Sequence, residues 1–399
     1  MNKSHLSNGS QDTATALMRG TNQTGVRDHN ERLVMSILRR DGALSKAEIA
    51  RLTGLSAQTV SVIMRELEAE EMLVRGAPRR GKVGQPSVPM SLNPDGAYFH
   101  GLLVGRRWVD HVLVDMNGEI RSKTRKSYEK PDFDDVLAFC QTAIDESVQE
   151  LPEERRSRVQ GVGLAIPFGI WEWADAFGAA QEDLMDWRDR DFATELGQMI
   201  GTDVIVQNDA SAACGAELVF GTSPDLPDLF MHMFIGYFIG GGLVIDNRLY
   251  TGPSGNAGAI GSMPVINASG KVAQLLDLAS LHGLSSRVIA ADKDQSYMFE
   301  SPLEWGQLED EVSDWIAELA PALAQAIATT VSLIDVPVVM IDGHLPDTVR
   351  HRIVDAVERA MKDTDFAGLE RPQIRAGTIG PDARSLGAAS LPLAAKFLV

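Results

Sequence analysis

The chain has 399 residues and a net charge of −18 at neutral pH, with 44% hydrophobic and 23% charged residues. This length exceeds one compact core and predicts two or three domains, and the composition excludes fibrous and largely unstructured chains. No apolar run of about 18 residues occurs, so we expect a cytoplasmic protein without a membrane-spanning helix, a signal peptide or a membrane partner. The two cysteines, Cys140 and Cys214, lack metal-ligand spacing and are expected as buried free thiols rather than as a disulfide.

Charge is distributed unevenly along the chain. Residues 1–95 contain 13 lysines and arginines against 10 aspartates and glutamates, a net charge of +3. Residues 96–399 contain 24 against 45, a net charge of −21. Because charges act over about 10 Å at physiological salt, a basic head can bind DNA although the whole chain is acidic.

The N-terminal residues are rich in serine, asparagine, threonine and glutamine. We therefore expect a disordered arm over residues 1–25, a DNA-binding domain over 26–95 and a large domain over 96–399. Asp28 and Glu31 fit a capping box, which predicts that the first helix begins there.

Two short helices joined by a tight turn are predicted over residues 45–67. Ser45 and Glu48 fit a capping box at the start of the first helix. Gly54 suits a turn with positive φ, and Ser56 can cap the second helix. This is the spacing of a helix-turn-helix, whose second helix enters the major groove. The residues expected to hydrogen-bond to bases or phosphates are Ser56, Gln58, Thr59, Ser61 and Arg65. A helical hairpin with a solvated polar face is the alternative.

A basic loop between two predicted strands follows. The strands are predicted at 72–74 and 87–92, and the loop between them is rich in glycine and proline, which is typical of a wing. Cations in a wing contact phosphates or a narrow minor groove. The wing residues expected to contact DNA are Arg79, Arg80, Lys82 and Gln85. A merely solvated loop is the alternative, but the position after a helix-turn-helix favours a DNA contact.

From about residue 98, predicted strands alternate with helices, which indicates an α/β domain with two similar lobes. Strands are predicted at 101–104, 109–115, 159–166, 203–206, 229–235, 240–245 and 338–341. Long helices are predicted at 134–150, 209–220 and 308–333.

Six short stretches carry a resemblance to a known family. They are Gly84-Gln85-Pro86, Ser91–Pro94, Val204–Ala210, Gly240–Gly242, Gly252–Gly258 and Gly387–Ala389. In this combination the chain, from about residue 30 onwards, resembles the ROK family, which unites sugar kinases with repressors of sugar metabolism. The resemblance implies a winged helix-turn-helix followed by a two-lobed, actin-like ATPase fold that holds a ligand between the lobes. It also implies that Asn208, Asp209, Asn256 and Gly258 bind that ligand.

The chain departs from the family where a kinase holds the phosphates of ATP. The first phosphate motif of the family is Asp-x-Gly-Gly-Thr, and the second is a glycine-rich turn. The residues at these positions are Leu103, Gly105, Arg106, Arg107, Tyr237 and Phe238. Large side chains there would crowd the phosphates, so no kinase activity and no cofactor are expected. Asp209 is then a relic of the family's general base, and capping of the 209–220 helix is its alternative role.

The metal and sugar positions also depart from the family. The zinc-binding histidine of the family corresponds to Ser262, and no cysteine follows, so no metal site is expected. His282 is expected at the surface. Two further sugar-binding carboxylates of the family correspond to Ala259 and Leu276, which favours an effector with fewer hydroxyl groups or a modified sugar. The tryptophans of the segment that closes over the sugar in relatives are Trp171, Trp173 and Trp187, and core packing is the alternative role for each.

The sequence therefore predicts a transcriptional regulator of carbohydrate metabolism, a repressor in the first place, with an activator as the alternative. Its expected partners are a double-stranded DNA operator, a sugar or sugar-derived effector, and further copies of itself in a homodimer or homotetramer. Two alternatives stay open: a sugar kinase with degenerate ATP motifs, and a DNA-binding protein that responds to no ligand.

Overall fold

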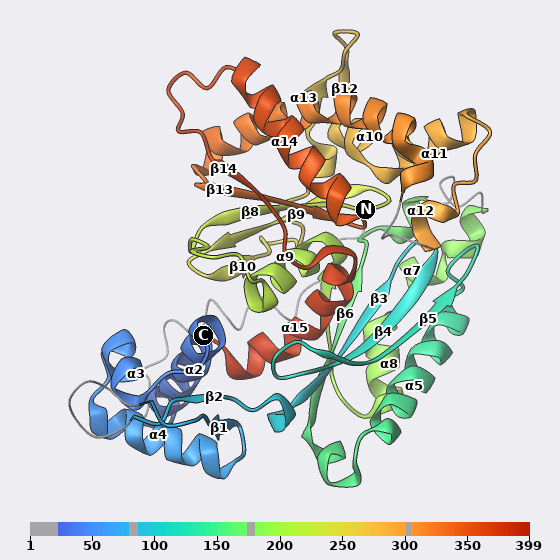
Figure 1. Cartoon of the computed structure of the whole chain (residues 1–399). Coiled ribbons are helices and arrows are strands. Elements are labelled where there is room, and N and C mark those ends of the chain that lie inside the picture. Colours follow the sequence, from blue (N-terminus) through green and yellow to red (C-terminus); the bar gives the residue numbers. More distant parts are fainter. Residues whose placement is uncertain (1–22, 80–86, 174–179, 301–304) are drawn as a thin grey trace.

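The computed structural model describes residues 23–79, 87–173, 180–300 and 305–399. A small head of three helices lies beside a body of two lobes, and the C-terminal helix runs from the body to the head (Figure 1). This is the mixed α/β architecture that the sequence predicts.

Three helices and a two-stranded antiparallel sheet form the head. They are α2 (Gln23–Asp41), α3 (Lys46–Thr53), α4 (Ala57–Ala69), β1 (Leu73–Arg75) and β2 (Met90–Leu92). Ser45 and Glu48 make the predicted capping box of α3. Gly54 ends that helix with a φ of 70°, and Ser56 caps α4. The local signals of the helix-turn-helix are therefore confirmed.

The start of the first helix differs from the prediction. Helix α2 begins at Gln23, so Asp28 and Glu31 lie inside it and do not cap it. Glu31 instead forms an ion pair with Arg27, one turn earlier, at 2.9 Å. Residues 1–22 of the expected arm lie outside the described residues.

Each lobe of the body is built on a five-stranded sheet, and the two sheets share one topology. The first lobe has the order β5-β4-β3-β6-β7, with β3 (Tyr98–Val104), β4 (Trp108–Asp115), β5 (Ile120–Ser127), β6 (Val159–Ile166) and β7 (Val204–Asn208). The second has the order β10-β9-β8-β13-β14, with β8 (Phe230–Ile235), β9 (Ile239–Ile245), β10 (Arg248–Tyr250), β13 (Val338–Gly343) and β14 (Gln373–Ala376). In both, three antiparallel strands are followed by two parallel ones, which confirms two similar lobes.

Helices cover the outer faces of both sheets. The first lobe carries α5 (Phe133–Glu150), α7 (Asp186–Asp189) and α8 (Phe192–Ile200). The second carries α10 (Leu275–Ala279), α11 (Leu281–Ala290), α12 (Tyr297–Glu300), α13 (Glu309–Ile334) and α14 (Asp347–Asp363), with a hairpin of β11 (Pro264–Ile266) and β12 (Val272–Gln274). By length and composition alone α13 could cross a membrane, but its buried side chains, Trp315 among them, belong to the core of the second lobe.

Two helices pack against each other between the lobes, α9 (Asp209–Phe220) and α15 (Ala383–Phe397). Glycine permits this close approach. A Cβ atom at Gly387 would lie 1.8 Å from the carbonyl oxygen of Ala212 in α9. A Cβ atom at Gly163, in β6, would lie 1.9 Å from the carbonyl oxygen of Ala388. The contact of α15 with both lobes therefore depends on the absence of side chains at these two positions.

We predict that Gly387→Ala destabilises the protein although alanine is the better helix former. The gain in helix propensity is about 1 kcal/mol. The clash with the Ala212 carbonyl should outweigh it, because overpacking a tight contact costs about 1–3 kcal/mol, and the loss should appear as a lower midpoint of thermal unfolding. Gly283→Ala in α11 is the matched control, since its added Cβ atom would lie an ordinary 3.6 Å from the Asp277 carbonyl oxygen. Equal stability of the two variants would contradict the prediction.

Candidate DNA-binding surface and ligand-binding cleft

The N-terminal half of α4 presents a surface without carboxylates. Gln58 and Arg65 are exposed on it, and Ser61 between them is half-buried. The two acidic residues of α4 lie in its second half, and both form ion pairs within the head, Glu66 with Arg27 and Glu68 with Arg75. The end of the helix that would enter a major groove is therefore neutral to basic, as DNA binding requires.

Two of the predicted contact residues also have structural roles. The Ser56 hydroxyl accepts a hydrogen bond from the backbone N–H of Thr59 at 3.1 Å, and the hydroxyls of Ser56 and Thr59 lie 2.8 Å apart. Both side chains thus stabilise the start of α4, which leaves Gln58, Ser61 and Arg65 as its outward-facing polar residues.

The structure adds Lys46 to this surface. Its ammonium group donates a hydrogen bond to the Ser61 hydroxyl at 3.2 Å, so the start of α3 lies beside α4. The pairing joins residues 15 positions apart, and only the crossing of the two helices reveals it. Arg51, also on α3, is exposed as well.

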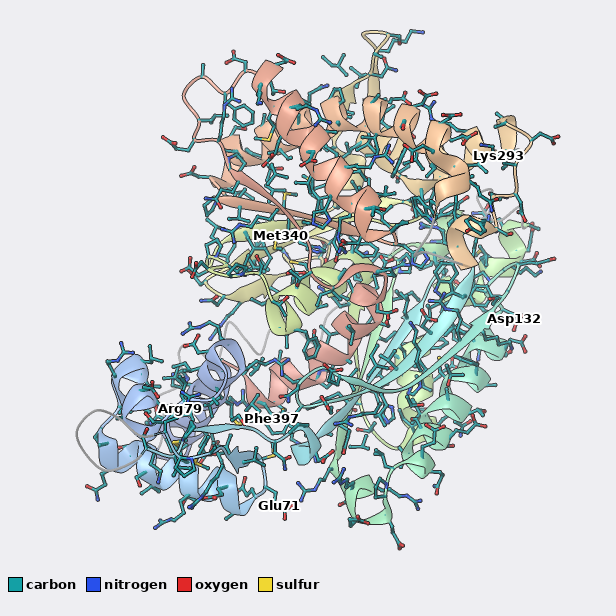
Figure 2. The ribbon with its side chains drawn as sticks, viewed as in Figure 1. Glu71, Arg79, Asp132, Lys293, Met340 and Phe397 are labelled. Atoms are coloured by element: carbon teal, nitrogen blue, oxygen red, sulfur yellow. The ribbon has the colours of Figure 1, made fainter. Side chains whose placement is uncertain are left out.

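The wing is described only at its base. Arg79 is exposed, and its backbone pairs with Ser87 through two hydrogen bonds of 2.8 and 3.1 Å. Figure 2 shows Arg79 on the head. The other predicted wing contacts, Arg80, Lys82 and Gln85, lie outside the described residues.

A half-buried arginine of α2 and the end of α15 both hold the head on the body. The Arg39 guanidinium donates to the carbonyl oxygens of Val219 at 2.7 Å and Asn117 at 3.0 Å. It also stacks 4.5 Å from the centre of the Phe220 ring. Burial lowers the pKa of Arg39 to about 10, so it stays charged at neutral pH.

At the end of α15, Phe397 lies next to the head (Figure 2) and meets Phe99 of the first lobe edge-on, with ring centres 5.9 Å apart. The backbone N–H of Val399 donates to the Ser36 hydroxyl of α2 at 3.1 Å. A single helix therefore links the space between the lobes with the head.

Asp209, the expected relic of a general base, is neutralised by an arginine. It is the first residue of α9, and its carboxylate lies 3.0 Å from the Arg384 guanidinium at the start of α15. The N-cap of α9 is Asn208, whose side-chain oxygen accepts from the backbone N–H groups of Ala210 and Ser211. Asn208, and not Asp209, is therefore the main capping residue of α9.

The two turns that correspond to the family's phosphate motifs contact each other across the lobes. Arg106 lies in the turn between β3 and β4, and Phe238 in the equivalent turn between β8 and β9. The Arg106 guanidinium stacks 4.2 Å from the centre of the Phe238 ring. Arg107 stacks on Phe299 at 5.0 Å and on Tyr237 at 5.7 Å. The sequence predicts that these side chains would crowd the phosphates of ATP. In the structure they contact one another and fill the space between the lobes.

A small cavity remains beside these contacts. It measures about 20 Å³, and its lining includes Arg106, Arg107, Arg384 and His344. Such a space holds about one water molecule, whereas a ligand pocket usually measures about 300–1,000 Å³. The structure therefore represents a closed cleft.

The remaining predicted ligand residues, Asn256 and Gly258, lie in the segment between β10 and β11. Gly258, with a φ of 82°, packs on Gly241 of β9, and Gly240 packs on Ala210 of α9. Asn256 is exposed and has no hydrogen bond to any described residue. Gly240 and Gly241 are adjacent in the strand and face opposite sides of the sheet, so Gly258 and α9 pack on different faces of β9, and the ligand roles of Gly258 and Asn256 stay predictions.

The tryptophans of the predicted sugar-closing segment differ in their surroundings. Trp187 is buried, donates to the Pro131 carbonyl at 2.7 Å and stacks on Phe192, so it is a core residue. Trp171 packs at the edge of the same core. The side chain of Trp173 lies outside the described part. His282 is exposed, as predicted, and lies 3.1 Å from the Tyr237 hydroxyl.

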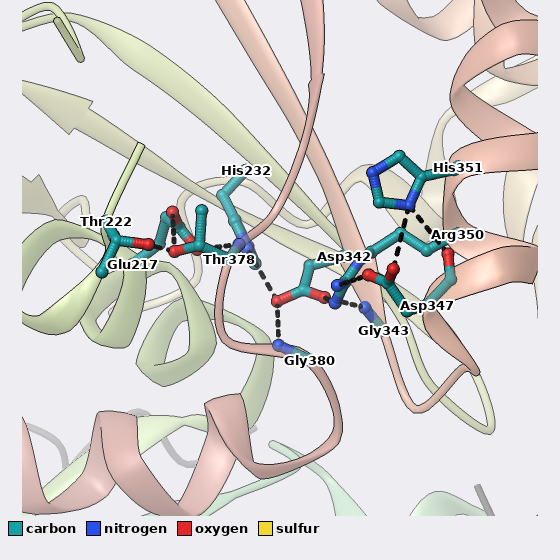
Figure 3. Close-up of polar contacts among 10 residues, drawn as sticks. All are labelled: Glu217, Thr222, His232, Asp342, Gly343, Asp347, Arg350, His351, Thr378 and Gly380. Atoms are coloured by element: carbon teal, nitrogen blue, oxygen red, sulfur yellow. Dashed lines mark hydrogen bonds and ion pairs between the residues drawn. The ribbon is translucent and has the colours of Figure 1, made fainter. Parts of the chain in front are cut away.

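A buried polar cluster holds the loop that leads into α15 (Figure 3). Asp342 accepts from the Gly380 N–H at 2.9 Å and pairs with Arg350 at 2.8 Å. Glu217 of α9 accepts from both the N–H and the hydroxyl of Thr378 at 2.8 Å. Burial raises the pKa of Glu217.

With His232, these two carboxylates form the one group of three metal-ligating side chains in the described ranges, with ligand atoms within 4.8 Å. Arg350 forms an ion pair with Asp342, and Thr378 donates two hydrogen bonds to Glu217. Both carboxylates therefore have protein partners, and neither needs a bound metal ion to stabilise it.

Comparison with known proteins identifies both parts of the chain. The model of the ROK family matches residues 99–395, and that of winged helix-turn-helix DNA-binding domains matches residues 27–74. The xylose repressor of Bacillus subtilis is 25% identical over 61% of this chain and 62% of its own length. The protein y4fQ of Sinorhizobium fredii is 24% identical over 92% of this chain and 91% of its own length.

Solved structures share the fold. A ROK family transcriptional regulator, described as a homolog of the E. coli MLC protein, has a TM-score of 0.64 at 20% identity and covers 93% of this chain and 97% of its own. A ROK family glucokinase from Streptomyces griseus has a TM-score of 0.56 at 20% identity. The match covers 74% of this chain and 99% of the glucokinase chain.

We predict that Arg384→Met destabilises the protein by about 3 kcal/mol, because Asp209 then lacks its nearest cation in a largely buried position. Adding Asp209→Asn to this variant should recover part of the loss by removing the orphaned charge. Chemical denaturation of both variants, with Arg248→Met at an exposed position as control, measures the difference. A double variant less stable than Arg384→Met would contradict this account of the pair.

Proposed function

The chain belongs to the ROK family, and on that premise we propose that it is a cytoplasmic transcriptional repressor of carbohydrate metabolism without kinase activity. The head binds a double-stranded DNA operator, and the cleft between the lobes binds a sugar or sugar-derived effector. The observation that carries the proposal is the contact of Arg106 with Phe238, which joins the lobes where a kinase would hold ATP phosphates. The similarity to the xylose repressor supports the choice of a sugar.

The protein acts as a homodimer or homotetramer. Helix-turn-helix proteins read two half-sites about one helical turn apart, and the symmetry of the protein matches that of the operator. Two heads at a fixed separation would then select a palindromic site.

Helix α15 supplies the route from effector to operator. It spans about 20 Å from Arg384 in the cleft to Phe397 at the head. An effector that parts the lobes changes the packing of α15 between them, and with it the position of the head. Such a ligand shifts the equilibrium only by its difference in affinity for the closed and open states.

We predict that the full chain binds the DNA upstream of its own gene with an affinity that falls as salt rises. Arg65→Ala should weaken binding about tenfold or more, because one base contact contributes about 1–3 kcal/mol. Arg248→Ala, at an exposed site on the second lobe, is the control. Fluorescence anisotropy measures both. A wild-type chain that shows no salt-dependent binding, or an Arg65 variant that matches it, would contradict the DNA-binding role.

We also predict that the chain does not phosphorylate sugars. The retained Asp209 is the one feature that favours a kinase, but Arg384 neutralises it and the phosphate space is filled. An assay of ATP consumption with Mg²⁺ and a panel of hexoses and pentoses tests this. Turnover that Asp209→Asn abolishes would establish the kinase alternative instead.

A further inference from the structure

Each of the two helices between the lobes follows a strand of one lobe and packs on the sheet of the other (Figure 1). Helix α9 follows β7 of the first lobe, but it lies directly on the second sheet, where a Cβ atom at Gly242 of β9 would overlap Cys214. Helix α15 follows β14 of the second lobe and packs on Gly163 of β6 in the first. Glu217, near the end of α9, accepts two hydrogen bonds from Thr378 of the second lobe. The end of α9 is therefore fixed to the second lobe.

The end of α9 meets the head at Arg39. The Arg39 guanidinium, from α2, donates to the carbonyl oxygen of Val219 at 2.7 Å and lies 4.5 Å from the centre of the Phe220 ring. The last four carbonyl groups of a helix have no partner within it, so a cation from another element stabilises this end. Arg39 thus completes the C-terminal end of a helix that is held by the second lobe.

The same guanidinium binds the first lobe. It donates to the carbonyl oxygens of Met116 and Asn117, with 3.0 Å to Asn117, in the turn between β4 and β5. Gly118 of that turn has a φ of 86°, and a Cβ atom there would overlap the Phe220 ring. The Phe220 ring therefore contacts both the turn and Arg39, and one side chain of the head reaches both lobes.

From this arrangement we infer that Arg39 is a positioning residue, which fixes the head relative to both lobes and transmits a change in their relative position to the head. The inference deepens the proposed function and rests on it, since the head must move if an effector is to alter operator binding. A hydrogen bond to a carbonyl oxygen is lost beyond about 3.5 Å. Arg39 therefore reaches both lobes only while they keep their present spacing at this point, and when they part it keeps one set of partners and loses the other.

The head has further attachments to the first lobe. The chain leaves the head through the short 3-10 turn Pro94–Gly96 and enters β3 directly. The Pro94 carbonyl accepts from the backbone N–H of Met116 at 3.1 Å, and Glu71 of the head forms an ion pair with Arg158, just before β6. These contacts hold the head on the first lobe, whereas Arg39 also connects it to α9. Loss of Arg39 should therefore loosen the head towards the second lobe more than towards the first.

Arginine suits this position because its planar guanidinium carries N–H donors in a fixed fork and also stacks on aromatic rings. Its Nε, Nη1 and Nη2 atoms bind the carbonyl groups of Val219, Met116 and Asn117, respectively. A lysine would keep the charge but lose the planar fork. The neighbouring Arg40, on the same helix, is exposed and pairs with Asp41 within the head, so it provides a matched control.

Distances between pairs of spin labels in the full chain, measured by pulsed electron paramagnetic resonance, test the inference. Cys140 and Cys214 are fully buried, so labels can be attached to introduced cysteines. One pair joins Ala69 of the head to Glu146 of the first lobe, and the other joins Ala69 to Arg248 of the second lobe; all three positions are exposed. We expect a single narrow distance peak for both pairs in the chain that carries no other substitution.

Arg39→Met should replace the narrow peak between the head and the second lobe by a broad one, and change the peak between the head and the first lobe less. Arg39→Lys should give an intermediate width, and Arg40→Met should leave both peaks unchanged. A residue that only stabilised the fold would lower the midpoint of thermal unfolding and leave the distances within the folded chain unchanged.

DNA binding gives an independent readout. Arg39→Met should weaken binding to the DNA upstream of the gene about threefold or more, since only part of the heads then adopts the competent position. The dependence of the affinity on salt should stay the same, because Arg39 binds carbonyl groups of the body and not phosphates.

Two outcomes would overturn the inference: distances in the folded Arg39→Met chain that match those of the wild type, or equal broadening in Arg40→Met. Where Arg39→Met does not fold, Arg39→Lys decides by the same criterion. Failure of the proposed function is seen separately, because a wild-type chain without DNA binding can still show distances that respond to Arg39. A chain that binds DNA but keeps its distances without Arg39 would retain the regulator and lose this residue's role.

Discussion

The packing of α15 between the two lobes is the constraint on which the other features depend. At its start, the buried carboxylates of Asp342 and Glu217 fix the loop that precedes it. In its middle, Gly387 lets it lie against α9 without room for a methyl group. At its end, Phe397 and the last residues pack beside α2. A helix held so closely along its length transmits a displacement rather than absorbing it, since close-packed interiors move between discrete arrangements.

The chain has kept the scaffold of a sugar kinase while changing the two turns that would hold a nucleotide. A kinase needs small residues there so that backbone N–H groups reach the phosphates. Here an arginine from one turn lies on an aromatic ring from the other, and Asp209, which corresponds to the family's general base, is in an ion pair with Arg384. The residues that stand at the family's phosphate positions are thus the ones that create the interlobe contact.

The sequence predicts the features that short-range physics determines. The capping box of α3, the glycine after it and the cap of α4 follow from residues no more than four positions apart, and they define the helix-turn-helix. Pairings between distant residues could not be predicted. Asp209 meets Arg384 across 175 positions, and Arg39 reaches Val219 across 180. The sequence pattern does not predict strand β5, because this polar edge strand lacks the alternation of apolar and polar residues that identifies strands.

That edge strand has a consequence for assembly. β5 borders its sheet, where unpaired backbone groups invite strand addition by a second molecule. Arg121, Lys123 and Arg125 occupy alternate exposed positions along it, each tied to a carboxylate of the same chain. A row of anchored cations opposes the approach of an identical edge. Aggregation through this border is thereby discouraged, without the cost of a proline or a bulge in the strand.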